Sequence, residues 1–169
     1  MISYISFLRA INVGGANPIS MAALKQVYED LGCLDVQTIL QTGNVLFSSP
    51  SPPNIAPEIE SRFGHRPEVI LKERTYFDSL VGAAPFRHHP HLNPSWQVVM
   101  FLASKPSQEA VDTIKTNAEE IWLQGEDLCI TYPGGIGRSK VTTARIEKAL
   151  GILGTMRNWR TLQTIHASG

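Results

Sequence analysis

Apolar and polar positions in the first part of the chain follow two different periods. Residues 2–8 (ISYISFL) are rich in β-branched and aromatic side chains, which predicts a short buried strand. Ser20 is a typical helix N-cap, and Gly32 is a typical helix end. Between them, apolar residues recur at helical spacing: Met21, Leu24, Val27, Tyr28 and Leu31. The pattern therefore predicts a helix directly after the first strand.

A hairpin, a second helix and another strand are predicted next. Residues 36–49 read as two strands around Thr42–Asn44, where Gly43 readily takes the positive φ of a tight turn. Helical spacing then returns in a weaker stripe, made of Ile55, Ile59 and Phe63. Residues 68–72 (EVILK) predict a further strand. The order is therefore strand, helix, strand, strand, helix, strand.

The second part of the chain repeats this order. Its predicted strands and helices are residues 96–103, 106–118, the two halves of 120–132 around Gly125, 142–151 and 154–158. Phe77, Leu80 and Val81 suggest a helix that bridges the two parts, and Trp159, Leu162 and Ile165 suggest a last helix over 159–167.

Two consecutive β-α-β-β-α-β units predict an α+β fold of two ferredoxin-like plaits, with a bridging helix and a C-terminal helix. The helices of each plait are expected on one face of a mostly antiparallel sheet. We predict a first plait over residues 1–73, a bridging helix and loop over 74–95, and a second plait with the C-terminal helix over 96–169.

Composition narrows the function classes. The chain has 169 residues, 43% of them hydrophobic, and no net charge, which argues against a dedicated nucleic-acid protein. Cys33 and Cys129 have no C-x-x-C partner and are expected to be buried thiols. Neither a bilayer-spanning apolar stretch nor a signal peptide is found in the sequence, so no membrane partner and a cytoplasmic location are expected.

Three segments carry a resemblance to a bacterial family, the domain of unknown function 1697. They are FLRAINVGGANPISM (7–21), LQTGNVLFSS (40–49), and SKVT (139–142) together with TMRNWRT (155–161). The chain departs at Ala10, where the family usually has glycine, and at Thr42, where serine is common and the hydroxyl is kept. The resemblance implies the double-plait architecture and brings no established activity.

The first glycine-rich loop is a candidate anion site. Gly14 and Gly15 let the backbone approach a ligand, and Asn12 and Asn17 add side-chain donors. The loop leads from a strand to a helix N-terminus, where anions are favoured, and Arg9 could add a forked cation. The alternative is a β-to-α connection fixed by its asparagines, with Arg9 paired to a carboxylate. The glycine spacing is not the dinucleotide fingerprint.

A second glycine-rich loop, residues 133–145, has a similar layout. Lys140 lies three residues after Gly137, so the phosphate-loop pattern is not met. Arg138, Ser139 and Lys140 still supply donors and positive charge, the alternative being an exposed basic loop. If the loops converge with the segment near the C-terminus, the ligand-binding residues are Arg9, Asn12, Gly14, Gly15, Asn17, Gln41, Gly43, Asn44, Ser139, Lys140, Arg157 and Asn158.

No catalytic, metal or cofactor site is predicted. The histidines of FRHHPH (86–91) lie in a proline-rich stretch without nearby cysteines, which disfavours a zinc site. Ser139 precedes Lys140 directly, so a Ser–Lys dyad would need an irregular backbone. Carboxylates lie mostly on predicted helix surfaces, where they are solvated. We therefore single out no nucleophile, general acid or general base.

These observations favour a binding module for a small anionic ligand that is phosphorylated or nucleotide-like. An enzyme in the same cleft stays open, with Lys140 or Arg9 stabilising a developing negative charge. A protein–protein adaptor that uses exposed sheet edges also stays open. RNA binding as in RNA-recognition motifs is disfavoured, because Tyr4 and Phe7 point to opposite faces of a regular strand. No pattern indicates an oligomeric state.

Overall fold

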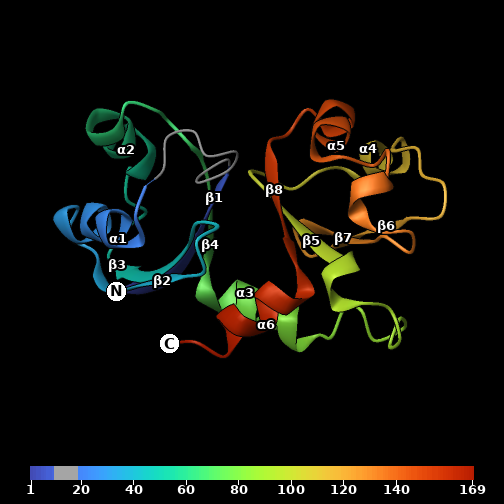
Figure 1. Ribbon diagram of the computed structural model, residues 1–169, viewed down its shortest axis with the longest axis horizontal. Coiled ribbons are helices and arrows are strands. Elements are labelled where there is room, and N and C mark those ends of the chain that lie inside the picture. Colours follow the sequence, from blue (N-terminus) through green and yellow to red (C-terminus); the bar gives the residue numbers. More distant parts are fainter. Residues whose placement is uncertain (10–18) are drawn as a thin grey trace. The chain divides into compact units, whose positions relative to one another are not determined.

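The computed structural model describes residues 1–9 and 19–169, and they form a mixed α/β protein with two four-stranded antiparallel sheets (Figure 1). The chain divides into two compact units. Unit 1 comprises Met1–Asp78 and Ala167–Gly169, and unit 2 comprises Ser79–His166. Over the described ranges, no helix has the length and apolar character that a membrane span needs.

The predicted order of strands and helices is confirmed in both units. The elements of the first part are β1 (Ile2–Arg9), α1 (Met21–Asp30), β2 (Leu34–Ile39), β3 (Asn44–Ser49), α2 (Ile55–Phe63) and β4 (Glu68–Glu73). Those that follow are α3 (Arg74–Gly82), β5 (Gln97–Leu102), α4 (Gln108–Asp112), β6 (Glu120–Gln124), β7 (Asp127–Thr131), α5 (Thr143–Leu150), β8 (Gly154–Asn158) and α6 (Trp159–His166). Short 3-10 turns lie at Pro94–Trp96 and Ile136–Arg138.

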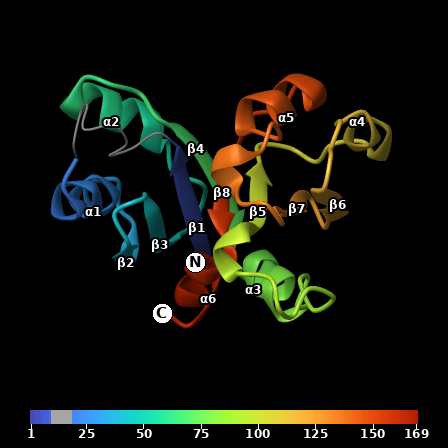
Figure 2. The same cartoon turned by 45° about the vertical axis from the view of Figure 1, so that its right-hand side comes forward.

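The sheet of unit 1 has the strand order β2-β3-β1-β4. Helices α1 and α2 lie on the same face of this sheet, as both Figure 1 and Figure 2 show. Their apolar stripes pack with alternate residues of the strands to form one core, whose members include Tyr4, Leu24, Tyr28, Phe47 and Ile59. The helices therefore bury one face of the sheet, as period-2 strands and period-3.6 helices require.

Local signals in the sequence place these elements accurately. The Ser20 hydroxyl accepts a hydrogen bond from the Ala23 amide at 3.0 Å and caps α1. Gly43 has φ 85° in the turn between β2 and β3, where left-handed backbone favours glycine. Both positions agree with the prediction.

The sheet of unit 2 has the order β6-β7-β5-β8. Helices α4 and α5 pack on one face of it through Val111 and Ile146, which join Val98, Met100 and Ile130 in a second core. Strand β8 matches the predicted segment 154–158, and Leu162 and Ile165 of α6 are buried as expected.

The predicted helix over 106–118 is wrong in length, because α4 ends at Asp112. The Thr113 hydroxyl donates to the Ala110 carbonyl at 2.6 Å, and the Ile114 amide bonds to the Val111 carbonyl, so the last turn tightens. Ala118, which follows Val111 and Ile114 at helical spacing and would share their face in a helix over 106–118, is exposed. The residues after Asp112 include β-branched and short polar side chains, which support a helix poorly.

Both cysteines are buried thiols, as predicted. Burial raises the pKa of both, that of Cys129 to about 12. At mildly alkaline pH the thiolate fraction of Cys129 is therefore on the order of one part in ten thousand. We expect the thiols of the folded protein to react slowly with a chromogenic disulfide reagent. In concentrated guanidinium chloride, where the protein is unfolded, both thiols should react. Rapid reaction of Cys129 in the folded protein would contradict its burial.

Candidate functional site

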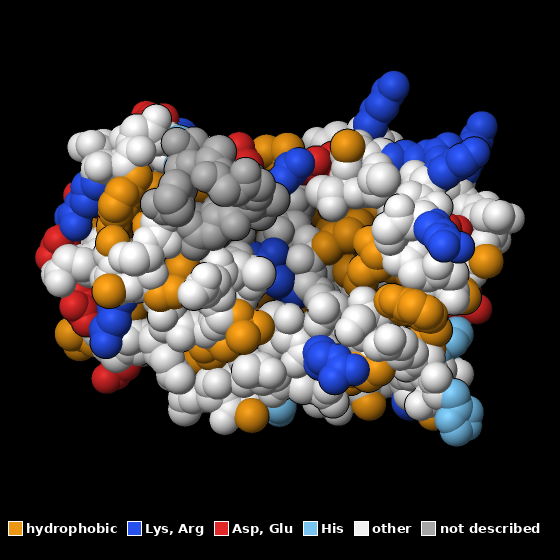
Figure 3. Space-filling model, viewed as in Figure 1, with side chains coloured by type: hydrophobic (Ala, Val, Ile, Leu, Met, Phe, Trp, Pro, Cys, Tyr) orange, Lys and Arg blue, Asp and Glu red, His pale blue; other side chains and the backbone are white. Residues whose placement is uncertain are grey.

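The turn before α5 and the helix itself carry four exposed cations, Arg138, Lys140, Arg145 and Lys148, which we call the basic segment. Among the residues that the structure describes, none of these four side chains pairs with a carboxylate. Figure 3 shows Lys and Arg side chains gathered over and beside α5. The segment therefore gathers four cations that form no direct ion pair within the described part of the chain, with the carboxylates of Glu119 and Glu147 nearby.

Backbone geometry brings three of these charges, those of Arg138, Lys140 and Arg145, to the start of α5, whereas Lys148 lies in its last turn. Gly135 has φ 87° and opens the short 3-10 turn that carries Arg138. The Thr142 hydroxyl caps α5 by accepting from the Arg145 amide at 3.2 Å. The Arg145 guanidinium reaches back, and its Nη1 donates to the Lys140 carbonyl at 3.3 Å. The N-terminal end of a helix favours anions, so these three cations and the helix dipole would both attract an anion there.

The predicted ligand residue Ser139 has a structural contact. Its hydroxyl donates to the Glu119 carboxylate at 2.6 Å and accepts from the Val141 amide at 3.0 Å. This hydrogen bond from Ser139 is the main cause that lowers the pKa of Glu119. Ser139 therefore ties the basic turn to the residue that precedes β6.

Arg157 and Asn158 lie in unit 2 as well, at the end of β8. Arg157 follows Met156, which packs on the core beneath α5, so its side chain lies on the opposite face of the sheet. Its Nη1 donates to the Thr155 hydroxyl at 2.8 Å and the Met156 carbonyl at 2.9 Å, and burial lowers its pKa to about 10. The Asn158 side chain accepts from the Thr161 amide at 2.9 Å and caps α6.

Unit 1 holds the remaining described candidates. Asn44 is 1% exposed, and its amide donates to the Ile39 carbonyl and the Thr42 hydroxyl, each at 2.9 Å. The Gly43 carbonyl accepts from the Leu8 amide at 2.8 Å, whereas Gln41 is exposed at the hairpin. Arg9 pairs in register with Glu68 at the end of β1. The predicted residues Asn12, Gly14, Gly15 and Asn17 lie outside the described residues.

The family described as "Protein of unknown function (DUF1697)" has a sequence profile that matches residues 1–128. The chain belongs to this family. The resemblance seen in the segments 7–21 and 40–49 is thereby confirmed, and the basic segment lies beyond the matched range. No curated protein matches this DUF1697 chain.

A solved structure shares the fold of this DUF1697 protein. It is titled "The structure of conserved bacterial protein SP0830 from Streptococcus pneumoniae". The two chains superpose with a TM-score of 0.72 over 98% of this chain and 97% of that one, at 19% identity. At this identity the likeness shows the fold alone.

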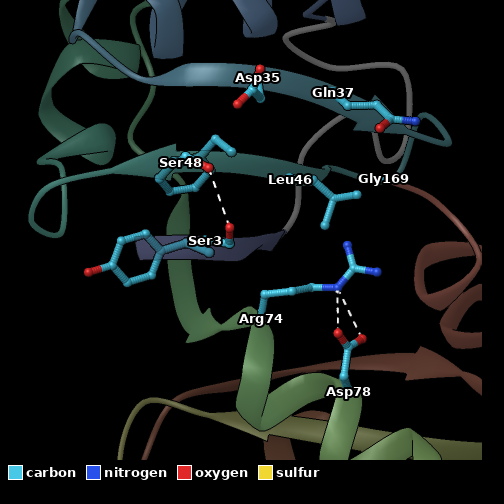
Figure 4. Close-up of a pocket in the computed structure, with 10 residues that line it drawn as sticks. Ser3, Asp35, Gln37, Leu46, Ser48, Arg74, Asp78 and Gly169 are labelled. Carbon is cyan, nitrogen blue, oxygen red and sulfur yellow. Dashed lines mark hydrogen bonds and ion pairs between the residues drawn. The ribbon is translucent and has the colours of Figure 1, made fainter. Parts of the chain in front are cut away.

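One hollow of the DUF1697 protein, of about 520 Å³, lies in unit 1 and was missed by the sequence reasoning. Figure 4 shows Arg74 and Asp78 of α3 together below the paired strands β1 and β3, which carry Ser3 and Ser48. The Arg74 Nε donates to both Asp78 oxygens, at 3.0 and 3.1 Å, and its Nη2 donates to the Ser168 carbonyl at 2.9 Å. The i,i+4 spacing signals this pair, and its charges compensate each other.

A second hollow, of about 480 Å³, lies in unit 2 between β6 and the loop after α3. Its lining comprises Pro85, Arg87, His88, His89, Glu120, Trp122 and Gln124. From the sequence, the histidines were weighed only as metal ligands, and Trp122 was not identified as a candidate. Over residues 1–9 and 19–169, no three metal-ligating side chains are grouped to hold an ion. The sequence does contain a signal for this lining. Glu120, Trp122 and Gln124 alternate with two apolar residues, which places the three on the same face of a strand.

Proposed function

We propose that this protein binds a small anionic ligand, phosphorylated or nucleotide-like, through the basic segment. The observation that carries the proposal is the set of four exposed cations at α5, which have no carboxylate partner among the described residues. Within the described ranges, the two nearby carboxylates accept hydrogen bonds from other groups and form no ion pair with these cations. Glu119 accepts from Ser139, and Glu147 accepts from the Gly154 amide at 3.0 Å.

The chemistry of these side chains suits a phosphate group. Arg138 and Arg145 offer planar forks of N–H donors that match phosphate oxygens, and Lys140 adds a compact charge. Because the segment is exposed, its attraction for an anion weakens as salt screens it. The other predicted ligand residues stay predictions: Arg9, Asn12, Gly14, Gly15, Asn17, Gln41, Gly43, Asn44, Ser139, Arg157 and Asn158.

Removal of Lys140 and Arg145 together tests the proposal. We expect the double variant Lys140→Ala, Arg145→Ala to bind adenosine 5′-monophosphate and pyrophosphate at least tenfold more weakly, because charged hydrogen bonds contribute about 1.5–3 kcal/mol each. Isothermal titration at low and moderate salt gives the affinities, and thermal shift gives the linked stabilisation.

The control is a second double variant, Lys105→Ala, Lys115→Ala, which removes the same charge from exposed positions outside the basic segment. It should keep the affinity of the original protein within about twofold at moderate salt. If both double variants lost the same affinity, the loss would be explained by net charge and not by a site at the basic segment. The proposal is refuted if neither anion binds or if the Lys140, Arg145 variant binds both unchanged.

We also infer that each unit is a ferredoxin-like plait and that the two are a duplication. The strand orders β2-β3-β1-β4 and β6-β7-β5-β8 correspond strand for strand, which supports this inference. The division into residues 1–73, 74–95 and 96–169 stays a prediction. It assigns α3 to the bridge, whereas the boundary between the compact units falls inside that helix.

A further inference from the structure

The hollow beside β6 has an aromatic wall. The Trp122 indole and the His89 imidazole are stacked, with ring centroids 6.3 Å apart and planes 21° from parallel. Both side chains line the hollow and both are half-buried, so part of each ring faces solvent. A wall of this kind accepts a flat ring by stacking, an interaction that every aromatic heterocycle can make.

The wall is held in place from behind. Phe86 is 4% exposed and meets Trp122 edge-on, with centroids 5.7 Å apart, and meets Trp159 in the same way at 5.3 Å. Phe86 therefore restricts how the Trp122 indole can turn. A ring fixed before binding loses little conformational entropy when a ligand arrives.

The loop that carries His89 is fixed as well. The His89 amide donates to the Phe86 carbonyl at 2.9 Å, and the His89 carbonyl accepts from the buried Gln97 side chain at 2.9 Å. Arg87 Nη1 donates to the Ala83 carbonyl at 3.1 Å at the end of α3. The hollow is thus bounded by an ordered loop on one side and by a strand on the other.

Polar groups flank the indole along β6. Glu120 and Gln124 lie two residues before and two residues after Trp122, so all three side chains share one face of the strand. Along the strand, each of the two polar residues is about 7 Å from Trp122. The Glu120 carboxylate is mostly exposed and contacts His89 Nε2 at 3.2 Å. A ring stacked on Trp122 would therefore meet a carboxylate acceptor at one edge and an amide at the other.

We propose that this hollow binds a nucleobase, stacked on Trp122 with the N–H groups of its edge donated to Glu120. A volume of about 480 Å³ suits a nucleoside-sized ligand. Guanine fits the acceptor best, because two adjacent N–H donors on its edge can reach one carboxylate. The proposed site shares no residue with the basic segment, so a nucleoside without phosphate reports on it alone.

Guanosine titration followed by tryptophan emission tests this proposal. We expect guanosine to quench the emission of the original protein and to bind more tightly than uridine. Trp122→Leu should lose the quenching and bind at least fivefold more weakly, since stacking of one base contributes a factor of about 5 to 150. Glu120→Gln, an exposed substitution that leaves the core intact, should weaken guanosine about tenfold and reduce its advantage over uridine.

Two controls separate the outcomes. Trp96→Phe changes a tryptophan that does not line this hollow and should keep both quenching and affinity. The double variant Lys140→Ala, Arg145→Ala should bind guanosine unchanged, even if the basic segment proves to bind no anion. A five-nucleotide single strand run in parallel distinguishes a free nucleoside from a nucleic-acid strand. The proposal is overturned if guanosine does not bind, if only the strand binds, or if Glu120→Gln and Trp122→Leu both bind guanosine normally.

Discussion

Phe47→Ala should lower the free energy of unfolding by about 3–5 kcal/mol, among the largest effects expected from one substitution in this chain. Phe47 is 2% exposed on β3. Its ring stacks on Tyr4 with centroids 5.5 Å apart and meets Tyr28 at 5.0 Å, so it connects β1, β3 and α1. Alanine would leave a cavity between two tyrosines that cannot collapse without moving a strand.

Urea unfolding followed by far-UV circular dichroism measures this loss. Leu34→Ala is the matched control, because Leu34 lies in the same sheet but is 54% exposed. We expect the control to change stability by no more than about 0.5 kcal/mol. A loss below about 1 kcal/mol for Phe47→Ala would mean that this core repacks around the cavity.

The sequence predicted the elements well where one local signal decided them. The Ser20 hydroxyl bonds an amide three residues away and Gly43 supplies a positive φ at its own position, so neither needs a distant partner. The segment 106–118 failed because its apolar spacing is helical while its later residues are poor helix formers. Spacing reports which side chains can share a face, whereas the length of a helix also depends on the residues between them.

The candidate site was predicted less completely, for a related reason. Asn44 and Ser139 were predicted as ligand-binding residues, and their hydrogen bonds to the Ile39 carbonyl and the Glu119 carboxylate are revealed only by the folded geometry. Lys140 and Arg138 were identified from the sequence. Arg145 was not, and it lies beside them because the first turn of α5 brings its guanidinium to the Lys140 carbonyl. Polar residue types indicate where chemistry is possible, and the tertiary contacts determine which groups stay available for it.

The hollow beside β6 also depends on tertiary structure that the local sequence does not reveal. Trp122 has an apolar residue on either side, so the sequence favours burial for it. Its partial exposure follows from the position of β6 at the edge of the sheet, which depends on how four strands pair. Pairing of this kind is a property of the whole unit and not of the segment.

Gly154→Ala is the second substitution for which we expect a large effect, a loss of about 1–3 kcal/mol in the free energy of unfolding. Gly154 opens β8 and pairs in register with Leu102 of the central strand β5. A Cβ at this position would lie 2.8 Å from the Leu102 and Met100 side chains and from the Phe101 carbonyl oxygen. The two side chains are fully buried, and the carbonyl belongs to a strand paired on both sides, so none of the three can move freely.

Gly82→Ala provides the control, since Gly82 ends α3 with nothing within 4 Å of the added carbon. This substitution should be neutral or stabilise by up to about 1 kcal/mol, because alanine restricts the unfolded chain more than glycine does. The two glycine substitutions add the same methyl group, one at a crowded strand position and the other at an open helix end. Urea unfolding of both variants measures the difference, and equal stabilities would show that β8 shifts away from β5 at little cost.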